Sequence, residues 1–164
     1  MQYTPRLESR PAFTIAGIQA RVTPMSPHIH ALWQRFIPML TQFEPIMRDP
    51  YASYGAMRHY DPSTKEFDYM AAIEIHYPVL LPADCVVWHI PAQDYAIVDG
   101  TFARLGDMFA YANTWLATSA YQDSHGHNFE YYAADFVGQP DSPVSIYIPI
   151  MAHNTAATQL TNSP

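Results

Sequence analysis

Residues 86–98, with the sequence VVWHIPAQDYAIV, decide the fold because they open a unit whose order of elements occurs twice in the chain. Two β-rich runs surround a turn at Pro91. Apolar residues then recur three or four positions apart, which predicts a helix; this stripe consists of Leu105, Met108, Phe109, Ala112, Trp115 and Leu116. Two further strands are expected at 129–136 and 144–150. The second half therefore reads strand, helix, strand, strand.

The first half repeats this order. A β-rich run at 13–22 ends before Pro24 and Pro27. Helical spacing follows over 28–43, with a kink or irregular turn expected at Pro38. Strands are expected at 54–60 and 67–77, joined by the turn-forming residues 61–65.

Equal element order predicts an α+β fold made of tandem β-α-β-β modules. Their strands would form one antiparallel sheet with two main helices on one face. A central ligand groove is expected on the other face or at the seam between the helices. The 164 residues are interpreted as one domain, 1–164, with a core at about 11–150 and frayed ends at 1–10 and 153–164.

Composition narrows the function classes. The formal charge is −7 and only eight residues are Lys or Arg, which argues against direct binding of nucleic acid. The single cysteine, Cys85, excludes an internal disulfide and fits a reducing compartment. Neither a signal peptide nor an apolar run of membrane-spanning length is found, so a cytoplasmic protein without a membrane role is expected. Twelve tyrosines suit the wall of a ligand pocket, although packing alone would also use them.

Several short segments, taken in order, resemble the GyrI-like effector-binding family over about residues 11–150. They are Ile90-Pro91-Ala92-Gln93-Asp94-Tyr95-Ala96, Trp115-Leu116 followed by Ser119-Ala120-Tyr121, Phe129-Glu130-Tyr131-Tyr132, Ile146-Tyr147-Ile148-Pro149-Ile150, and Phe67-Asp68-Tyr69 with Ile73-Glu74-Ile75. The chain departs from the family pattern at three places. Gln93 stands where glycine is usual, and Ala117 and Ala120 replace a proline and a glycine.

The resemblance implies a groove that binds lipophilic, often cationic, small molecules, as in regulators of the AraC and MerR types. The expected function is drug sensing or sequestration by a stand-alone binding domain. Two alternatives remain open: a hydrolase of strained electrophiles such as cyclopropanoids, and a protein-interaction role like that of a gyrase inhibitor. A homodimer is also possible. Enzyme activity is uncertain, and a binding protein is the preferred interpretation.

Glu130 is the first candidate site residue, because an unpaired carboxylate inside an aromatic strand is costly to bury. By strand alternation it shares a face with Tyr132. The matching glutamate of the family lies at the floor of the groove, and in hydrolytic relatives it assists the attack of water. The alternative is an edge-strand glutamate that faces water. Its expected aromatic companions are Tyr54, Tyr69, Tyr147, Trp115, Trp33 and Phe36, for each of which ordinary packing is the competing interpretation.

No cofactor or metal is expected. His28 with His30, and His125 with His127, lack a nearby third ligand, so solvated loop histidines account for them better than zinc does. Gly-x-Ser-x-Gly and glycine-rich phosphate loops are missing from the sequence. Cys85 has no signature of a catalytic nucleophile.

Overall fold

The structure is a computed structural model that describes residues 3–77 and 80–153. Within these ranges the chain forms nine strands and two α-helices, joined by loops and short 3-10 segments. The first half contains β1 (Arg6–Arg10), β2 (Phe13–Val22), α1 (Pro27–Phe36), β3 (Ser53–Arg58) and β4 (Phe67–Glu74). The second half contains β5 (Val86–Ile90), β6 (Gln93–Thr101), α2 (Leu105–Thr118), β7 (Tyr121–Asp123), β8 (Asn128–Tyr132) and β9 (Pro143–Ala152).

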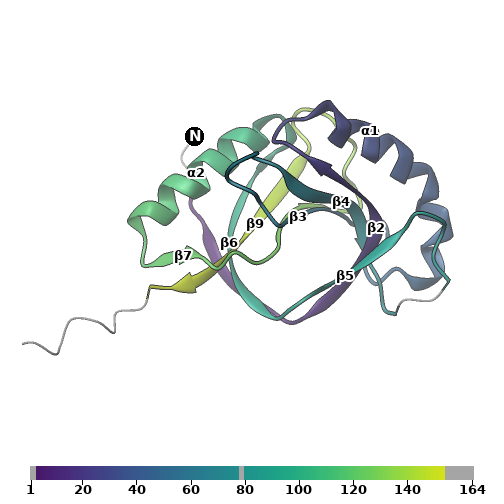
Figure 1. Ribbon diagram of the computed structural model, residues 1–164, viewed down its shortest axis with the longest axis horizontal. Coiled ribbons are helices and arrows are strands. Elements are labelled where there is room, and N and C mark those ends of the chain that lie inside the picture. The colour runs from purple at the N-terminus through teal and green to yellow at the C-terminus, as the bar shows by residue number, and fades with distance from the viewer. Residues whose placement is uncertain (1–2, 78–79, 154–164) are drawn as a thin grey trace, which may run out of the picture.

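All nine strands belong to one antiparallel sheet. Its order is β1-β6-β9-β8-β3-β4-β2-β5, and β7 pairs with β9 beside this path. Figure 1 shows that the sheet is strongly curved and that α1 and α2 lie against the same, outer side of it. The two modules meet where β3 pairs with β8, in the middle of the order. The expected α+β fold of two modules in one antiparallel sheet is confirmed.

A reciprocal exchange of strands also joins the modules. β1 opens the first half of the chain but pairs with β6 of the second, whereas β5 opens the second half and pairs with β2 of the first. Each of these two strands is followed by a Pro-Ala turn. The expectation of a frayed N-terminal segment is wrong for Arg6–Arg10, because pairing with β6 orders these residues as a strand although the first four are exposed. A frayed end was also expected at 153–164, and from residue 154 onward this segment lies outside the described residues.

Three clusters of buried apolar side chains form the core. One lies between α1 and the outer face of the sheet and includes Leu32 and Phe36. A second lies between α2 and the outer face and includes Met108 and Ala112. The third fills the concave, inner face, which the helices do not cover. Trp33 packs against both outer clusters and therefore marks the seam between the two helices.

Several expected boundaries are corrected. The first helix ends at Phe36, because Pro38 cannot continue the helical hydrogen bonds and a 3-10 segment, Ile37–Gln42, follows. The strand expected at 129–136 ends at Tyr132, where a turn closed by the bond from Phe136 N–H to the Ala133 carbonyl begins. In the described part of the chain, neither helix has the length and apolar character needed to cross a bilayer.

Candidate ligand site at the seam between the modules

Glu130 lies on β8 at the centre of the sheet, directly opposite Gly55 of β3. Its neighbours Phe129 and Tyr131 pack into the inner cluster. Because side chains alternate along a strand, Glu130 points to the other face, where Tyr132 packs below the helices. The carboxylate therefore lies on the helix-facing side, at the seam between the two modules.

Three aromatic side chains form a hydrogen-bonded chain to this carboxylate. The Tyr69 hydroxyl donates to Glu130 Oε2 at 2.9 Å, and the Tyr132 hydroxyl donates to the same oxygen at 2.7 Å. The Trp33 indole N–H donates in turn to the Tyr69 hydroxyl at 2.8 Å. These contacts bring together α1, β4 and β8, and the four residues are called the Glu130 site below. The hydroxyls fix the carboxylate without neutralising it.

Gly55 leaves the space that this arrangement requires. A Cβ atom at this position would lie 2.2 Å from the Tyr69 hydroxyl and 2.3 Å from Glu130 Oε2. Both distances are far below van der Waals contact. The glycine opposite Glu130 is therefore needed for the short approach of the two side chains.

The electrostatic surroundings keep the tyrosines protonated and disfavour the charge on Glu130. Burial raises the pKa of Glu130, against the hydrogen bonds from Tyr132 and Tyr69, which lower it. Burial, followed by the neighbouring Glu130 charge, raises the pKa values of Tyr69 and Tyr132 well above that of a free phenol. Both hydroxyls are thus hydrogen-bond donors at neutral pH rather than acid–base groups.

Glu130, which is partly buried, differs from the buried Glu74 in having no cationic partner. Within residues 3–77 and 80–153 it takes part in no ion pair. Glu74, which is only 7% exposed, is paired with Arg10 at 3.0 Å and Arg48 at 3.4 Å. A carboxylate that has lost part of its contact with water and has no counter-ion is unfavourable, and an added cation would relieve this cost.

Aromatic rings surround the Glu130 site on its helix-facing side. Tyr132 meets Trp33 edge to face, with centroids 5.5 Å apart, and Phe136 at 4.7 Å. Phe102 lies 6.2 Å from Tyr132 and is 38% exposed, so it forms the outer part of this wall. Faces of aromatic rings attract organic cations. The combination of a carboxylate and aromatic walls therefore suits a cation with apolar substituents.

Two surface depressions, of about 230 and 260 Å³, have linings that include none of the four residues of the Glu130 site. Neither of these depressions is therefore the Glu130 site itself. Phe102 is the most exposed of the rings named here.

The structure brings together only part of the predicted set. Glu130, Tyr69 and Trp33 are in one network, and Phe36 lies behind Trp33, with centroids 6.0 Å apart and no exposure. Tyr54 and Tyr147 belong to the inner cluster, on the opposite face of the sheet.

Trp115 stacks on Tyr121 of β7, near the far end of α2, and takes no part in this network. Sequence reasoning did not find Gly55, Phe102 or Phe136. Strand alternation had already placed Tyr132 beside Glu130. Gly55 could be predicted as a site residue only if the pairing of β3 with β8 were known, since this pairing places it opposite Glu130.

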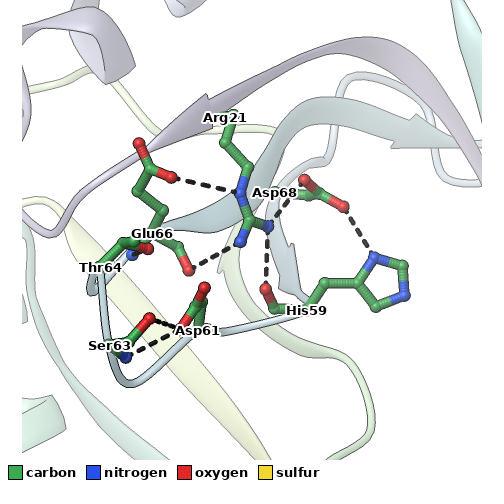
Figure 2. A network of polar contacts seen from close by, with 7 residues as sticks. All are labelled: Arg21, His59, Asp61, Ser63, Thr64, Glu66 and Asp68. Carbon is green, nitrogen blue, oxygen red and sulfur yellow. Dashed lines mark hydrogen bonds and ion pairs between the residues drawn. The ribbon is translucent and has the colours of Figure 1, made fainter.

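A second polar network lies at the hairpin between β3 and β4 (Figure 2). The Arg21 guanidinium donates to Asp68 at 3.0 Å and to the His59 carbonyl at 2.9 Å, and the His59 ring contacts Asp68 at 2.8 Å. Burial acts to raise the pKa of Asp68, but the bonds from His59 and Arg21 outweigh it and lower the pKa. Because Arg21 of β2 bonds to Asp68 of β4 and to the His59 carbonyl in the loop, this network fastens the hairpin to β2.

Comparison with known proteins assigns the chain to a protein family. A family model described as "Integron-associated effector binding protein" matches residues 6–150. The transcriptional regulator BrlR of Pseudomonas aeruginosa is 33% identical over 150 residues, which cover 88% of this chain and 54% of BrlR. The chain thus spans about half the length of this curated relative.

Two solved structures share the fold. One is SAV2435 bound to tetraphenylphosphonium, with a TM-score of 0.69, 17% identity and coverage of 92% of this chain and 94% of that one. The other is an integron cassette protein from the mobile metagenome of Vibrio cholerae, with a TM-score of 0.65, 20% identity and coverage of 91% and 97%. The family match over nearly the whole described core confirms the resemblance drawn from the sequence. The chain belongs to the integron-associated effector-binding proteins, within the GyrI-like effector-binding domains.

Proposed function

We propose that the protein binds a lipophilic organic cation at the Glu130 site, with the positive centre against the carboxylate and the substituents among the aromatic rings. The single observation that carries this proposal is the partly buried Glu130 carboxylate, held by two tyrosine hydroxyls and without a cationic partner in the described chain. The ligand would supply the missing charge. Sensing or sequestration of cationic compounds is then the biological role, in the cytoplasm, where a lone Cys85 stays reduced.

The aromatic walls determine which cations would bind. A small, strongly hydrated ion cannot use the faces of Trp33, Tyr132 and Phe102, whereas a delocalised cation with aryl or alkyl groups can. Each aromatic contact with such a cation contributes roughly 0.5–2 kcal/mol, depending on its desolvation. Selectivity for charge would come from Glu130 and selectivity for shape from the rings.

The relatives support a binding role. SAV2435, with the same fold, was solved with tetraphenylphosphonium, which is a lipophilic cation. BrlR is a transcriptional regulator, and this chain covers only about half of it. We therefore carry over ligand binding as the proposal and assign no DNA contact to these residues, whose formal charge is −7.

Calorimetric titration with tetraphenylphosphonium tests the proposal. Wild type is expected to bind it and to bind neutral triphenylphosphine oxide at least tenfold more weakly. Glu130→Gln keeps the size of the side chain but removes its charge, so the affinity for the cation should fall by about 2 kcal/mol or more. Asp141→Asn removes one charge from an exposed position and should leave the affinity unchanged.

Three outcomes would contradict the proposal. They are the absence of binding in wild type, equal affinity for the cation and the neutral oxide, and full affinity in Glu130→Gln. If Asp141→Asn weakens binding as much as Glu130→Gln does, the effect is one of net charge and not of this site.

A further inference from the structure

The inner face of the sheet holds a second carboxylate-and-aromatic arrangement, and a cation already occupies it. The guanidinium carbon of Arg10 lies 3.9 Å from the centre of the Phe13 ring. The same carbon lies 5.4 Å from Tyr54, 5.3 Å from Phe129 and 6.0 Å from Tyr147. These four rings, each 8% exposed or less, are called the interior cage below.

Two polar groups complete the interior cage. Arg10 Nη2 donates to the Tyr54 hydroxyl at 2.9 Å and to Glu74 Oε2 at 3.0 Å. The Tyr54 hydroxyl donates to the same Glu74 oxygen at 3.1 Å. Arg48, which is largely exposed, lies 3.4 Å from the other Glu74 oxygen. A flat guanidinium thus meets ring faces, a hydroxyl and a carboxylate at once, which a compact ammonium could not do as well.

The equivalent position in the second module shows that packing alone does not require this arginine. Arg10 ends β1 and precedes Pro11-Ala12, just as Ile90 ends β5 and precedes Pro91-Ala92. Arg10 pairs with the first residue of β6, and Ile90 pairs with the first residue of β2. Ile90 is only 1% exposed and belongs to the same inner cluster. An apolar side chain therefore fills the matching place, and the guanidinium is a feature of one module alone.

The interior cage is separate from the Glu130 site. Tyr54 precedes Gly55 and Phe129 precedes Glu130, so the two sites use alternate residues of β3 and β8 and lie on opposite faces. The strand that carries Arg10 lies at the edge of the sheet, pairs only with β6, and is exposed at Arg6, Leu7, Glu8 and Ser9. Arg10 is the one residue of β1 that reaches the interior, where its side chain is 17% exposed.

We propose that the interior cage is a second cation site, selective for an alkylguanidinium group, which the chain fills with its own Arg10 side chain. The interior cage holds the Arg10 side chain as it would hold a bound ligand, and this contact anchors the edge strand β1. Its presence also closes the interior cage to other cations, so that soluble cations reach only the outer face. The inference does not rest on any ligand at Glu130.

Rescue of a truncated side chain tests this site. Arg10→Ala removes the atoms that make up ethylguanidinium, so this compound should bind and refill the interior cage. Added at millimolar concentrations, it should raise the Tm of Arg10→Ala by about 2–4 °C at about five times its Kd. Ethylurea has a similar shape without charge and should have no effect. Wild type, whose interior cage is occupied, should respond to neither compound.

Two further variants define the site. Arg10→Met fills the space with an apolar chain and should not respond to ethylguanidinium. In Arg10→Ala with Glu74→Gln, the rescue should weaken at least tenfold in ligand concentration, because the carboxylate that holds the guanidinium is gone. In Arg10→Ala with Glu130→Gln it should be unchanged, which separates this inference from the function proposed for the other face.

If Arg10→Ala does not fold alone, the same comparison is made by near-ultraviolet circular dichroism. Ethylguanidinium, and not ethylurea, should then restore the native signal. The proposal is overturned if ethylguanidinium has no effect on Arg10→Ala, if ethylurea acts equally, or if wild type and Arg10→Met respond as Arg10→Ala does.

Discussion

At the scale of single residues, the Glu130 site is organised around a charge that the fold holds at a cost. Two tyrosine hydroxyls orient the carboxylate, but no described cation neutralises it, and burial raises its pKa. A residue that is unfavourable for stability and fixed in place by its neighbours is typical of a functional position. Glu74 shows the contrasting solution, in which Arg10 and Arg48 balance the charge.

The cost of the Glu130 charge predicts how stability depends on pH. The pKa of Glu130 is higher in the folded than in the unfolded chain, so the ionised group destabilises the fold above the folded pKa. This penalty disappears as the pH falls toward the ordinary glutamate value of 4.5. Glu130→Gln should therefore have a higher Tm than wild type at pH 7.5, by a margin that shrinks as the pH falls to 5. Melting curves of both proteins across this range measure the margin. A margin that is constant, or that grows on acidification, would show that the carboxylate is not held at a cost.

Gly55 gives a second prediction at this scale. In Gly55→Ala the new methyl group would overlap the Tyr69 hydroxyl and Glu130 Oε2, so the variant should lose about 1–3 kcal/mol of stability together with affinity for tetraphenylphosphonium. Gly106→Ala is the matched control, because its Cβ meets nothing within 4 Å and α2 should gain roughly 0.5–1 kcal/mol. Denaturant unfolding and calorimetric titration of both variants provide the test. Equal behaviour of the two alanine variants would refute the role given to Gly55.

At the scale of helices and strands, sequence periodicity predicted the elements that bury one face. Both helices and seven of the nine strands were found, because apolar residues recur in the helices at helical spacing and the strands are rich in β-forming residues between turn signals. β1 was missed because its side chains are exposed before Arg10 and its order comes from pairing with β6. The sequence also could not predict that Tyr54 and Glu130 lie on opposite faces of the sheet, since this depends on the register of β3 against β8. Phe102 lies in a short 3-10 segment and Phe136 in a loop, and no hydrophobic periodicity marks either of them.

The start of α1 gives a prediction at the same scale. The Ser26 side chain accepts a hydrogen bond from His28 N–H at 3.2 Å and caps the helix that carries Trp33. Ser26→Ala should lower the free energy of unfolding by about 1 kcal/mol. Thr41→Ala, at an exposed position in the following 3-10 segment, is the control and should change it by less than about 0.5 kcal/mol. Urea unfolding compares the two, and a Ser26→Ala variant as stable as the control would rule out the cap.

At the scale of the whole molecule, the exchange of β1 and β5 makes each module depend on the other. β1 completes the sheet beside β6 and β5 completes it beside β2, while β3 and β8 join the two halves at the centre. The inner cluster contains residues of both modules, such as Ile15 and Ile97. Neither half could unfold without exposing apolar surface of the other.

Unfolding should therefore be a single cooperative event. Phe36→Ala in the first module and Met108→Ala in the second are both at fully buried positions and should each lower one common Tm. Differential scanning calorimetry should give equal calorimetric and van't Hoff enthalpies for wild type. Two separable transitions, or a variant that shifts only part of the transition, would show that the modules unfold independently.

The central claim is that the ionised Glu130 carboxylate binds the positive centre of the ligand. The most direct test is the Kd of tetraphenylphosphonium measured from pH 4.5 to 8 for wild type and Glu130→Gln. Because a proton and the cation would compete for the same carboxylate, wild-type affinity should rise with pH by up to about tenfold per unit and level off above the raised pKa of Glu130. Glu130→Gln should bind weakly and without this dependence. A wild-type Kd that does not change with pH, or the same pH dependence in Glu130→Gln, would contradict the account.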